Sequence, residues 1–375
     1  MKTKQFSINL KIFTLLVMIS VPIFFYMAIC KADTSSSNAA DSNIELFTGN
    51  TMGTTYHIKV LMKKDGESKK SLSNLIEDKL KQVNQSMSVY LPDSEISLFN
   101  KSDKGDAIKI SPEFYDVMIT GQKLYTITEG SWDGTVKPLV DLWGFGTKRE
   151  ITSLPSSEII KAHLQTTGFN QIIISNTVTE NNTIKTLEKK NSSITLDLGS
   201  IAKGFGVDAV VELLKSRGYS DFLVEIGGEL FAAGEKTAGK SWVVGISKPD
   251  KGGNPYKKIY NEESGDNDIY RALPLKNKAL ATSGDYMSFT TIEGKNYSHI
   301  INPATGYPVD NGVVSASVIA DNCTFADGLA TALMVMGHEK GIDLVNRLES
   351  VECLIVARDK DGKLKNYRSK EFPLP

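Results

Sequence analysis

The spacing of apolar and polar residues predicts a chain of irregularly mixed strands and helices. Alternation predicts a strand pair within Phe47–Leu61, and helical periodicity predicts an amphipathic helix at Ser71–Met87. A further helix begins at Ser111-Pro112 and ends near Gly130, because Ser caps helices and Pro fits their first position. Other strands are predicted at Gln171–Ser175, Ile194–Leu198, Phe222–Ile226, Trp242–Ser247, Ala279–Ser283, Val313–Ala320 and Cys353–Arg358, and other helices at Ile201–Ser216, around Asp327 and at Glu339–Leu348. Without a strict strand–helix–strand period, this order favours an α+β fold with mixed sheets and packed helices.

The N-terminus has the pattern of an export segment. Three lysines precede the uncharged run Ile12–Ile29, and a Ser- and Asn-rich tether follows. We therefore predict a signal peptide or membrane anchor at residues 1–33, a flexible tether at 34–43 and the main folded domain at 44–375.

Three mechanisms of export remain open. Cys30 is the candidate lipid-modified residue of a lipoprotein, which is the preferred mechanism although Ile29 stands where a small residue is usual. The alternatives are simple cleavage after Ala32 and an uncleaved anchor, for which the 18 uncharged residues are just long enough. All three place the globular part outside the cell membrane.

Composition excludes some classes of function. The 375 residues carry 43 basic and 44 acidic side chains, a balance that leaves no electrostatic signature of nucleic-acid binding. Beyond the export segment only Cys323 and Cys353 remain, and we predict buried free thiols. No Cys and His residues have the spacing of a zinc site.

The helix within Ala326–Gly337 carries a polar pair on an otherwise apolar surface. Asp327 and Thr331 are four residues apart and therefore lie on the same helical face. Burying a carboxylate requires compensation, and carboxylate and hydroxyl oxygens suit Mg²⁺. The alternative is that Asp327 lies at the start of the helix and caps it.

The segment Ile194–Ala209 runs from a predicted strand through a turn into a helix. Free N–H groups at a helix start bind anions, and Lys203 adds a positive charge, so we predict a phosphate or pyrophosphate nearby. Gly204 and Gly206 also match a dinucleotide-binding pattern, with Glu225 about twenty residues later. That interpretation is disfavoured because these glycines fall inside the helix, where they would permit close packing instead.

Three other segments have candidate ligand contacts. Ser131–Gly146 combines aromatic residues with glycines, which suits either a planar ring ligand or core packing. Tyr90 follows a helix and is a candidate for stacking on a ring, or an ordinary surface residue. His299, near a Pro- and Gly-containing turn, is either a proton carrier or a structural residue.

Together these segments resemble the FAD:protein FMN transferases of the ApbE family, in the family's own order. The resemblance spans Asn50 to Gly337. It is carried by Thr51–Thr54, Met87–Asn100, Trp132–Gly146, Asp197–Gly204, Ala281–Asp285, His299–Pro308 and Ala326–Thr331. It implies an ApbE or T-fold-like α+β architecture. It also implies an enzyme that transfers FMN from FAD to a threonine hydroxyl of an exported partner and releases AMP.

The resemblance also implies roles for individual residues. Mg²⁺ would be held by Asp327, Thr331 and the backbone carbonyl of Ser200. His299 and Asp285 are the candidates for removing the proton of the acceptor. FAD would be bound by Met52, Tyr90, Ser131, Trp132, Asp133, Asp197, Lys203 and Ile301.

The implied partners are flavin-bearing subunits of exported electron-transfer complexes, of the sodium-pumping (Nqr) or Rnf type, with Asp-Gly-x-Thr-like sites. Two alternatives remain at this point. One is an FAD pyrophosphatase that releases FMN and AMP. The other is a membrane-tethered FAD-binding protein without catalysis, which the Asp327–Thr331 pair disfavours because binding a flavin needs no metal.

Overall fold

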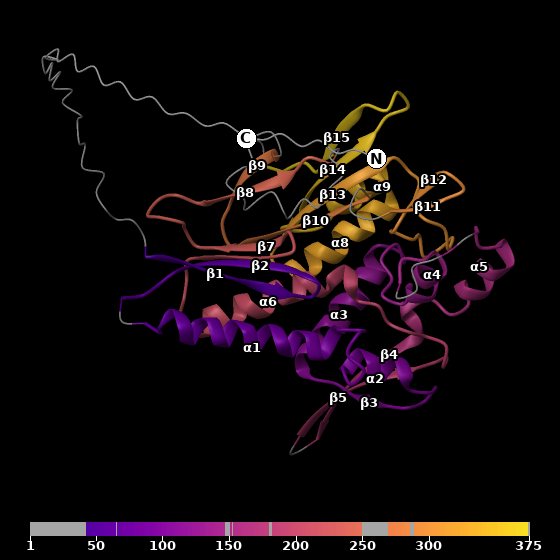
Figure 1. Ribbon diagram of the computed structural model, residues 1–375, viewed down its shortest axis with the longest axis horizontal. Helices are drawn as coiled ribbons and strands as arrows, with labels where there is room; N and C mark the ends of the chain where they lie inside the picture. Colours follow the sequence, from indigo (N-terminus) through magenta and orange to yellow (C-terminus); the bar gives the residue numbers. More distant parts are fainter. Residues whose placement is uncertain are drawn as a thin grey trace, which may run out of the picture. The chain divides into compact units, whose positions relative to one another are not determined.

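An eight-stranded antiparallel sheet carries the helices that build the centre of the protein (Figure 1). The computed structural model describes residues 43–64, 66–146, 151, 153–179, 182–249, 269–285 and 289–373. All of them belong to one unit, Asp41–Pro375. In sheet order the strands are β1 (Ile44–Thr51), β2 (Thr54–Leu61), β6 (Phe222–Ile226), β7 (Glu229–Ala233), β10 (Lys278–Gly284), β13 (Val313–Ala320), β14 (Glu352–Arg358) and β15 (Leu364–Arg368).

The two faces of this sheet are covered by different elements. Along β7, Phe231 and Ala233 contribute to the core between the sheet and the helices, whereas Leu230 and Ala232 point to the opposite face of the sheet. There they meet the two-stranded ribbon of β8 (Trp242–Ser247) and β9 (Ile269–Leu275). Both faces are therefore apolar, which explains why β7 and β13 are buried along their whole length.

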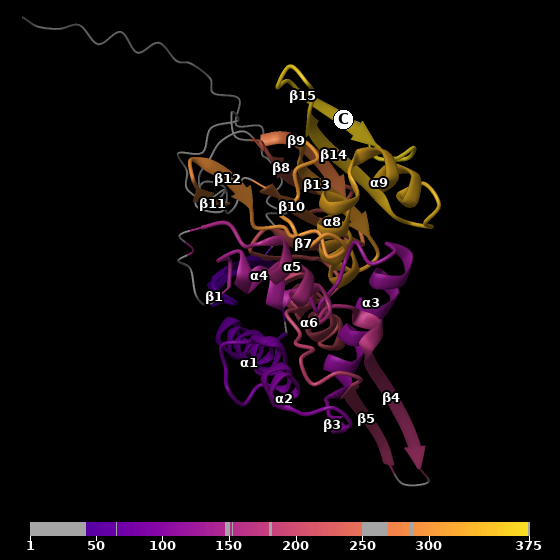
Figure 2. The ribbon, with the colours of Figure 1, turned by 90° about the vertical axis from the view of Figure 1, so that its right-hand side faces the viewer.

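Helices α6 (Gly199–Ser216) and α8 (Cys323–Met336) lie side by side beneath the sheet (Figures 1 and 2). Helix α8 contacts β10 and β13, and α6 contacts β6 and β7. Helix α1 (Lys69–Met87) packs on α6 from the other side. The remaining helices are α2 (Glu95–Lys101), α3 (Pro112–Ile127), α4 (Lys137–Leu142), α5 (Ser157–Leu164), the 3₁₀ helix η1 (Phe169–Gln171) and α9 (His338–Val345).

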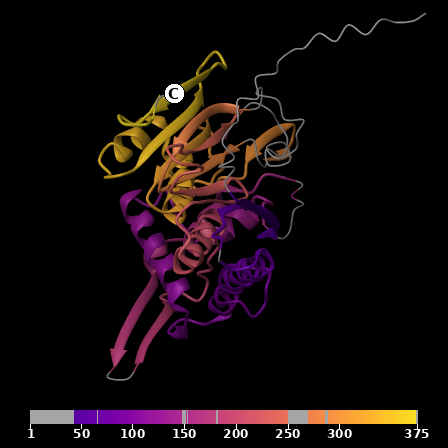
Figure 3. The same ribbon diagram turned by 90° about the vertical axis from the view of Figure 1, so that its left-hand side faces the viewer.

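Two smaller sheets complete the described part of the chain. Strand β5 (Asn182–Lys189) lies between β3 (Ile108–Lys109) and β4 (Ile172–Thr179), and the β4–β5 hairpin extends away from the helices (Figures 2 and 3). Strands β11 (Phe289–Ile292) and β12 (Lys295–Ser298) form a second hairpin.

The predicted α+β class is confirmed, as are most of the predicted elements. The burial of Leu72, Ile76, Leu80 and Val83 on α1 follows the predicted stripe. Ser111 caps α3 by accepting a hydrogen bond from the N–H of Phe114. Cys323 and Cys353 are buried free thiols, as expected.

The strand predicted at Ile194–Leu198 is wrong. The apolar residues alternate there because every second side chain is buried. The backbone, however, forms hydrogen bonds with a side chain and with a loop, and not with another strand. The Asn100 amide exchanges two hydrogen bonds with Leu196, and the N–H of Asp197 donates to the Gly134 carbonyl. Strand β5, which sequence did not predict, takes the place beside β4.

Two other predictions concern membranes and surface insertions. No helix within the described ranges is long and apolar enough to cross a membrane. The export segment at 1–33, with Cys30, and most of the insertion predicted at Lys248–Asp268 lie outside the described residues.

Lys189 gives a prediction about stability. It is fully buried, and its ammonium donates to the carbonyls of Asn100, Ser102 and Ser192. Burial lowers the pKa of this amine. Replacing Lys189 with Met should lower the free energy of unfolding by about 2–3 kcal/mol, because buried carbonyls lose their donor. Denaturant titration measures this loss, and the exposed neighbour Lys190, replaced in the same way, should change stability little. Equal losses of unfolding free energy in the two variants would show that the buried hydrogen bonds of Lys189 do not stabilise the fold.

Candidate active site

One carboxylate from each of the two central helices ties α6 to α8, Asp327 buried and Asp208 half-buried. Asp208 on α6 accepts hydrogen bonds from the N–H groups of Cys323 and Thr324, both at 2.8 Å. In return, Asp327 Oδ2 on α8 accepts from the N–H of Gly204 at 3.0 Å. A Cβ atom at Gly204 would lie 2.7 Å from the Cys323 carbonyl carbon. The absent side chain therefore permits the close approach of the helices.

The hydrogen bonds also decide between the two interpretations of Asp327. The cap of α8 is Asn322, whose side chain accepts from the N–H of Phe325. Asp327 is the fifth residue of the helix and is 1% exposed. The alternative that Asp327 caps the helix is therefore wrong.

Asp327 is part of a charged cluster with Lys203 and Glu229, in which the two carboxylates are buried and the lysine is half-buried. The Lys203 ammonium lies 2.9 Å from Glu229 Oε1 and 3.6 Å from Asp327 Oδ1. Burial raises the pKa of Asp327, although the Lys203 charge and the Gly204 N–H oppose this shift. Burial likewise raises the pKa of Glu229 to about 8, against the opposing charge of Lys203. The cluster holds two acidic groups and one ammonium in an apolar setting. Its second negative charge is offset either by a proton, as the raised pKa values indicate for the metal-free protein, or by an additional cation.

Thr331 and the end of β10 lie next to this cluster. Thr331 Oγ1 lies 3.0 Å from Ser283 Oγ and 3.4 Å from the Asp327 carbonyl. In an α-helix the N–H of Gly204 points at the carbonyl of Ser200, so the Asp327 carboxylate, bonded to the same N–H, lies near that carbonyl. The Asp327 carboxylate, the Thr331 hydroxyl and the Ser200 carbonyl are oxygen ligands of the kind that Mg²⁺ prefers.

A grouping of three or more His, Cys, Asp or Glu side chains suited to a metal is absent from the described ranges. The implied site is of another kind, because only one of its three ligands is a carboxylate.

The start of α6 is shaped by the loop at residues 131–135. Trp132 Nε1 donates to Ser200 Oγ at 3.0 Å, and Asp197 Oδ1 accepts from the N–H of Gly199 at 2.9 Å. The cap residue Leu198 has an apolar side chain, which offers no oxygen to the first N–H groups of the helix. The N–H of Gly199 donates to Asp197, and those of Ile201 and Ala202 donate to the Leu198 carbonyl, so the anion-binding end stays a prediction, with the Ser200 N–H and Lys203 as its candidates.

The side chains of Trp132 and Asp133 are buried in this loop. Trp132 is 1% exposed and packs against Phe169 with ring centroids 5.5 Å apart. The Asp133 carboxylate accepts from the Thr135 backbone and hydroxyl, and burial raises its pKa. The aromatic residues of Ser131–Gly146 thus include core packing, and Ser131–Asp133 can offer a ligand mainly its backbone.

Met52 and Tyr90 frame the same region. Met52 occupies the left-handed conformation, with φ 49°, in the turn between β1 and β2. Its methyl group lies over α6, where a Cβ at Gly206 would come within 2.5 Å. Tyr90 is 76% exposed in the loop after α1, so its ring is available for stacking.

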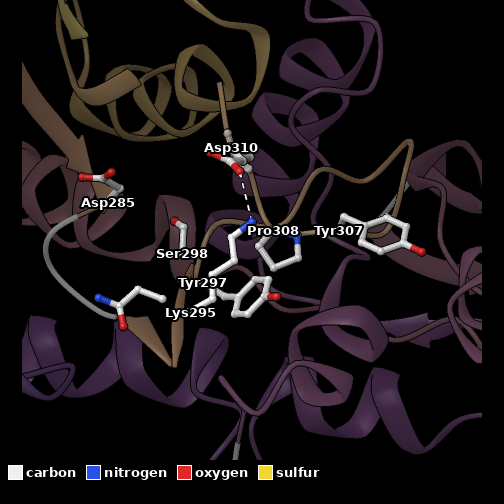
Figure 4. Close-up of a pocket in the computed structure, with 9 residues that line it drawn as sticks. Asp285, Lys295, Tyr297, Ser298, Tyr307, Pro308 and Asp310 are labelled. Carbon is white, nitrogen blue, oxygen red and sulfur yellow. Dashed lines mark ion pairs between the residues drawn. The ribbon is translucent and has the colours of Figure 1, made fainter. Parts of the chain in front are cut away.

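The remaining predicted site residues are Asp285, His299 and Ile301. Asp285 follows β10 and lines a hollow of about 510 Å³ (Figure 4). Ser298, the neighbour of His299 in the chain, lines the same hollow, whereas His299 is not among the residues that line it. The His299 ring lies edge-on to Phe145 at 6.4 Å. Ile301 is buried and pairs with Pro308 across the turn.

Sequence reasoning missed Glu229 and the role of Asp208. A signal for Glu229 was present, since it is a carboxylate that opens an otherwise apolar strand directly after Gly227-Gly228. Glu225, the acidic residue of the disfavoured dinucleotide pattern, instead binds His57 Nδ1 at 2.8 Å. Gly204 lies inside α6, so the pattern has no phosphate-binding turn.

The pKa of Glu229 gives a prediction about pH. Its ordinary value is 4.5, and a group with a higher pKa when folded binds more protons in the folded state. The free energy of unfolding of the metal-free protein should therefore fall as pH rises from about 4.5 towards 8. Replacing Glu229 with Gln should flatten this decline, as measured by denaturant titration across the interval. Equal slopes for both proteins would contradict the prediction.

Comparisons with known proteins identify the family. A sequence model of the ApbE family matches residues 52–355. The FAD:protein FMN transferase of Vibrio cholerae serotype O1 is 38% identical over 325 residues, which cover 87% of this chain and 90% of the relative. That of Haemophilus influenzae is 35% identical over 345 residues, covering 91% and 92%.

Solved structures agree with the sequence comparisons. The flavin transferase ApbE from Vibrio cholerae has a TM-score of 0.74 at 36% identity, covering 88% of this chain and 98% of that one. The apo flavinyl transferase ApbE of Pseudomonas stutzeri has a TM-score of 0.75 at 32% identity, covering 88% and 95%. The resemblance seen in the sequence is therefore confirmed, and this chain belongs to the ApbE family.

Proposed function

We propose that this protein transfers FMN from FAD to a threonine hydroxyl of an exported acceptor protein, with Mg²⁺, and releases AMP. The single observation that carries the proposal is the buried Asp327, with Thr331 on its face and Lys203 beside it, at the start of α6. The names of the relatives support FMN transfer from FAD.

The reaction is a displacement at phosphorus. The acceptor oxygen forms a bond to the FMN phosphorus, the bond from that phosphorus to the bridging oxygen breaks, and AMP departs with that oxygen. The hydroxyl proton moves to a base, for which His299 and Asp285 are the candidates. Lys203 and the first N–H groups of α6 bind the pyrophosphate and stabilise the charge that develops on it.

The metal would be held by the Asp327 carboxylate, the Thr331 hydroxyl and the Ser200 carbonyl. When bound, Mg²⁺ neutralises the pyrophosphate and the charge growing on the leaving AMP. Met52, the exposed Tyr90 ring, the Ser131–Asp133 backbone, Asp197 and Ile301 would bind the rest of FAD.

The test is incubation with FAD, Mg²⁺ and an acceptor that carries an Asp-Gly-x-Thr site, read by intact mass. The expected product is the acceptor with one FMN attached through a phosphoester, together with one AMP. Cleavage of FAD to free FMN and AMP with no modified acceptor would favour the pyrophosphatase instead. Unchanged FAD with several acceptors would leave only flavin binding.

We further propose that the protein acts on the outer face of the cell membrane on flavin-bearing subunits of Nqr- or Rnf-type electron-transfer complexes. The basic start, the 18-residue apolar run Ile12–Ile29 and the polar tether support this location. Lipidation of Cys30 is the preferred attachment.

Replacing Cys30 with Ser should remove the lipid label of a lipoprotein and release the protein from the membrane fraction. An uncleaved anchor would leave the variant membrane-bound and unchanged in size. A wild-type protein recovered in soluble form and starting at Asp33 would contradict both and indicate secretion.

A further inference from the structure

Glu229 is a buried carboxylate that the proposed reaction does not use. It opens β7 directly after the Gly227-Gly228 turn and pairs with Ile226 of β6. Paired residues share a face of the sheet, so Glu229 points to the helix side, with Phe231 two residues further along. Its side chain is only 2% exposed.

Glu229 contacts Lys203, one of the residues of the proposed active site. One carboxylate oxygen, Oε1, accepts a hydrogen bond from Lys203 at 2.9 Å. The other, Oε2, is buried and has no hydrogen-bond partner among the described residues. The stem of Lys203 reaches this position past Gly227, where a Cβ would lie 3.1 Å from the lysine Cδ. The turn glycine and the carboxylate thus fix the path of the lysine.

Lys203 lies between two carboxylates, at 2.9 Å from Glu229 and 3.6 Å from Asp327. An ammonium paired closely with Asp327 would neutralise it and repel a divalent cation at the same carboxylate. Glu229 supplies the nearer carboxylate and so keeps the ammonium from moving fully onto Asp327.

We propose that Glu229 is a positioning residue that retains the Lys203 ammonium and thereby leaves Asp327 available to Mg²⁺. This inference rests on the metal site of the proposed function. It assigns Glu229 an effect exerted through Lys203, without direct contact with metal or substrate. Without Glu229 the ammonium can move onto Asp327, 3.6 Å away, and compete there with the metal.

The test measures Mn²⁺ affinity of the purified full chain by electron paramagnetic resonance, with Mn²⁺ as the probe for Mg²⁺. Glu229→Gln keeps an oxygen acceptor for Lys203 but cannot ionise. Measured at pH 8.5, above the pKa of about 8 of Glu229 in the metal-free protein, the variant should weaken Mn²⁺ binding about tenfold. Lys203→Met removes the competing ammonium. Adding Glu229→Gln to Lys203→Met should then change the affinity little, because the residue through which Glu229 acts is gone.

Glu225→Gln is a matched control, since Glu225 lies on the same hairpin but points to the other face and binds His57. It should leave Mn²⁺ affinity unchanged. In turnover assays, Glu229→Gln should raise the Mg²⁺ concentration needed for half-maximal rate, and saturating Mg²⁺ should restore most of kcat. A purely structural role would not produce this rescue.

Four outcomes overturn the inference. Equal weakening by Glu229→Gln in the wild-type and Lys203→Met backgrounds would make Glu229 act directly on the metal. An unchanged Mn²⁺ affinity of Glu229→Gln would show that Glu229 has no positioning role. Equal weakening of Mn²⁺ binding in the Glu225→Gln control would show that both residues act only by stabilising the β6–β7 hairpin. Wild-type protein that binds no Mn²⁺ would refute the metal site itself, whereas the first three outcomes leave the proposed function intact.

Discussion

Replacing Asp327 with Ala is expected to slow FMN transfer by about a thousandfold or more while the protein remains folded. Asp327 is the one charged ligand assigned to the metal, so its loss removes most of the stabilisation of the developing phosphate charge. The rate is measured with saturating FAD and acceptor across a range of Mg²⁺ concentrations.

The contacts of Asp327 explain why the fold should survive. The N–H of Gly204 keeps its place in α6 and can still bond the Ser200 carbonyl. Lys203 keeps its closer partner, Glu229, at 2.9 Å. Asp327→Asn, which preserves an oxygen for Gly204, should lose the rate to a similar extent and unfold at nearly the wild-type temperature.

Asp208 offers a matched control, because it is the other carboxylate that joins α6 and α8. Asp208→Asn weakens the hydrogen bonds to the first two N–H groups of α8 and should lower the free energy of unfolding by about 1 kcal/mol, with the rate per folded molecule retained. Near-normal turnover of Asp327→Ala at low Mg²⁺ would show that Asp327 serves only to join the helices.

Replacing Gly204 with Ala is expected to damage both the fold and the site. The added Cβ would clash with the Cys323 carbonyl and lie 2.9 Å from Asp327 Cβ, and backbone cannot yield as a flexible side chain can. The helices must then separate. We expect a loss of about 2–3 kcal/mol in the free energy of unfolding. We also expect a roughly hundredfold slower transfer by the folded fraction, because small displacements of reacting groups are costly.

Thermal unfolding and the transfer rate measured on the same preparation separate the two effects. Gly245→Ala on β8 is the control, since a Cβ there meets Ile269 at 3.5 Å, an ordinary contact distance. It should alter neither quantity appreciably. A Gly204→Ala protein with wild-type stability and rate would contradict this prediction, because it would show that α6 and α8 can accommodate the added methyl group without loss.

The helices were the part of the fold most accessible from the sequence. A stripe such as Leu72, Ile76, Leu80 and Val83 repeats at the helical period, and caps such as Ser111 mark boundaries. Strands were less certain, because a buried extended segment alternates whether or not it is paired. At Ile194–Leu198 the backbone bonds went to the Asn100 amide, a partner 96 residues away from Leu196 that no local pattern reveals.

In the candidate site, too, some residues follow from local sequence patterns and others only from the tertiary structure. Asp327 and Thr331 share a helical face by spacing alone, and Lys203 near a helix start is a local pattern too. Glu229 enters the site only because the β6–β7 turn and the strand alternation aim it at α6. Asp208 is half-buried because α8 begins against it.

The sequence alone therefore determined what depends on neighbours along the chain: the helices, the mixed α+β class, the polar pair on an apolar helix, and the ordered motifs that identify the ApbE family. The tertiary structure alone decided which buried charges meet. The cluster of Lys203, Glu229 and Asp327 joins positions up to 124 residues apart, and its geometry follows from a helix contact that only Gly204 permits. Burial and charge pairing depend on distances in space, and the pattern along the chain does not encode them locally.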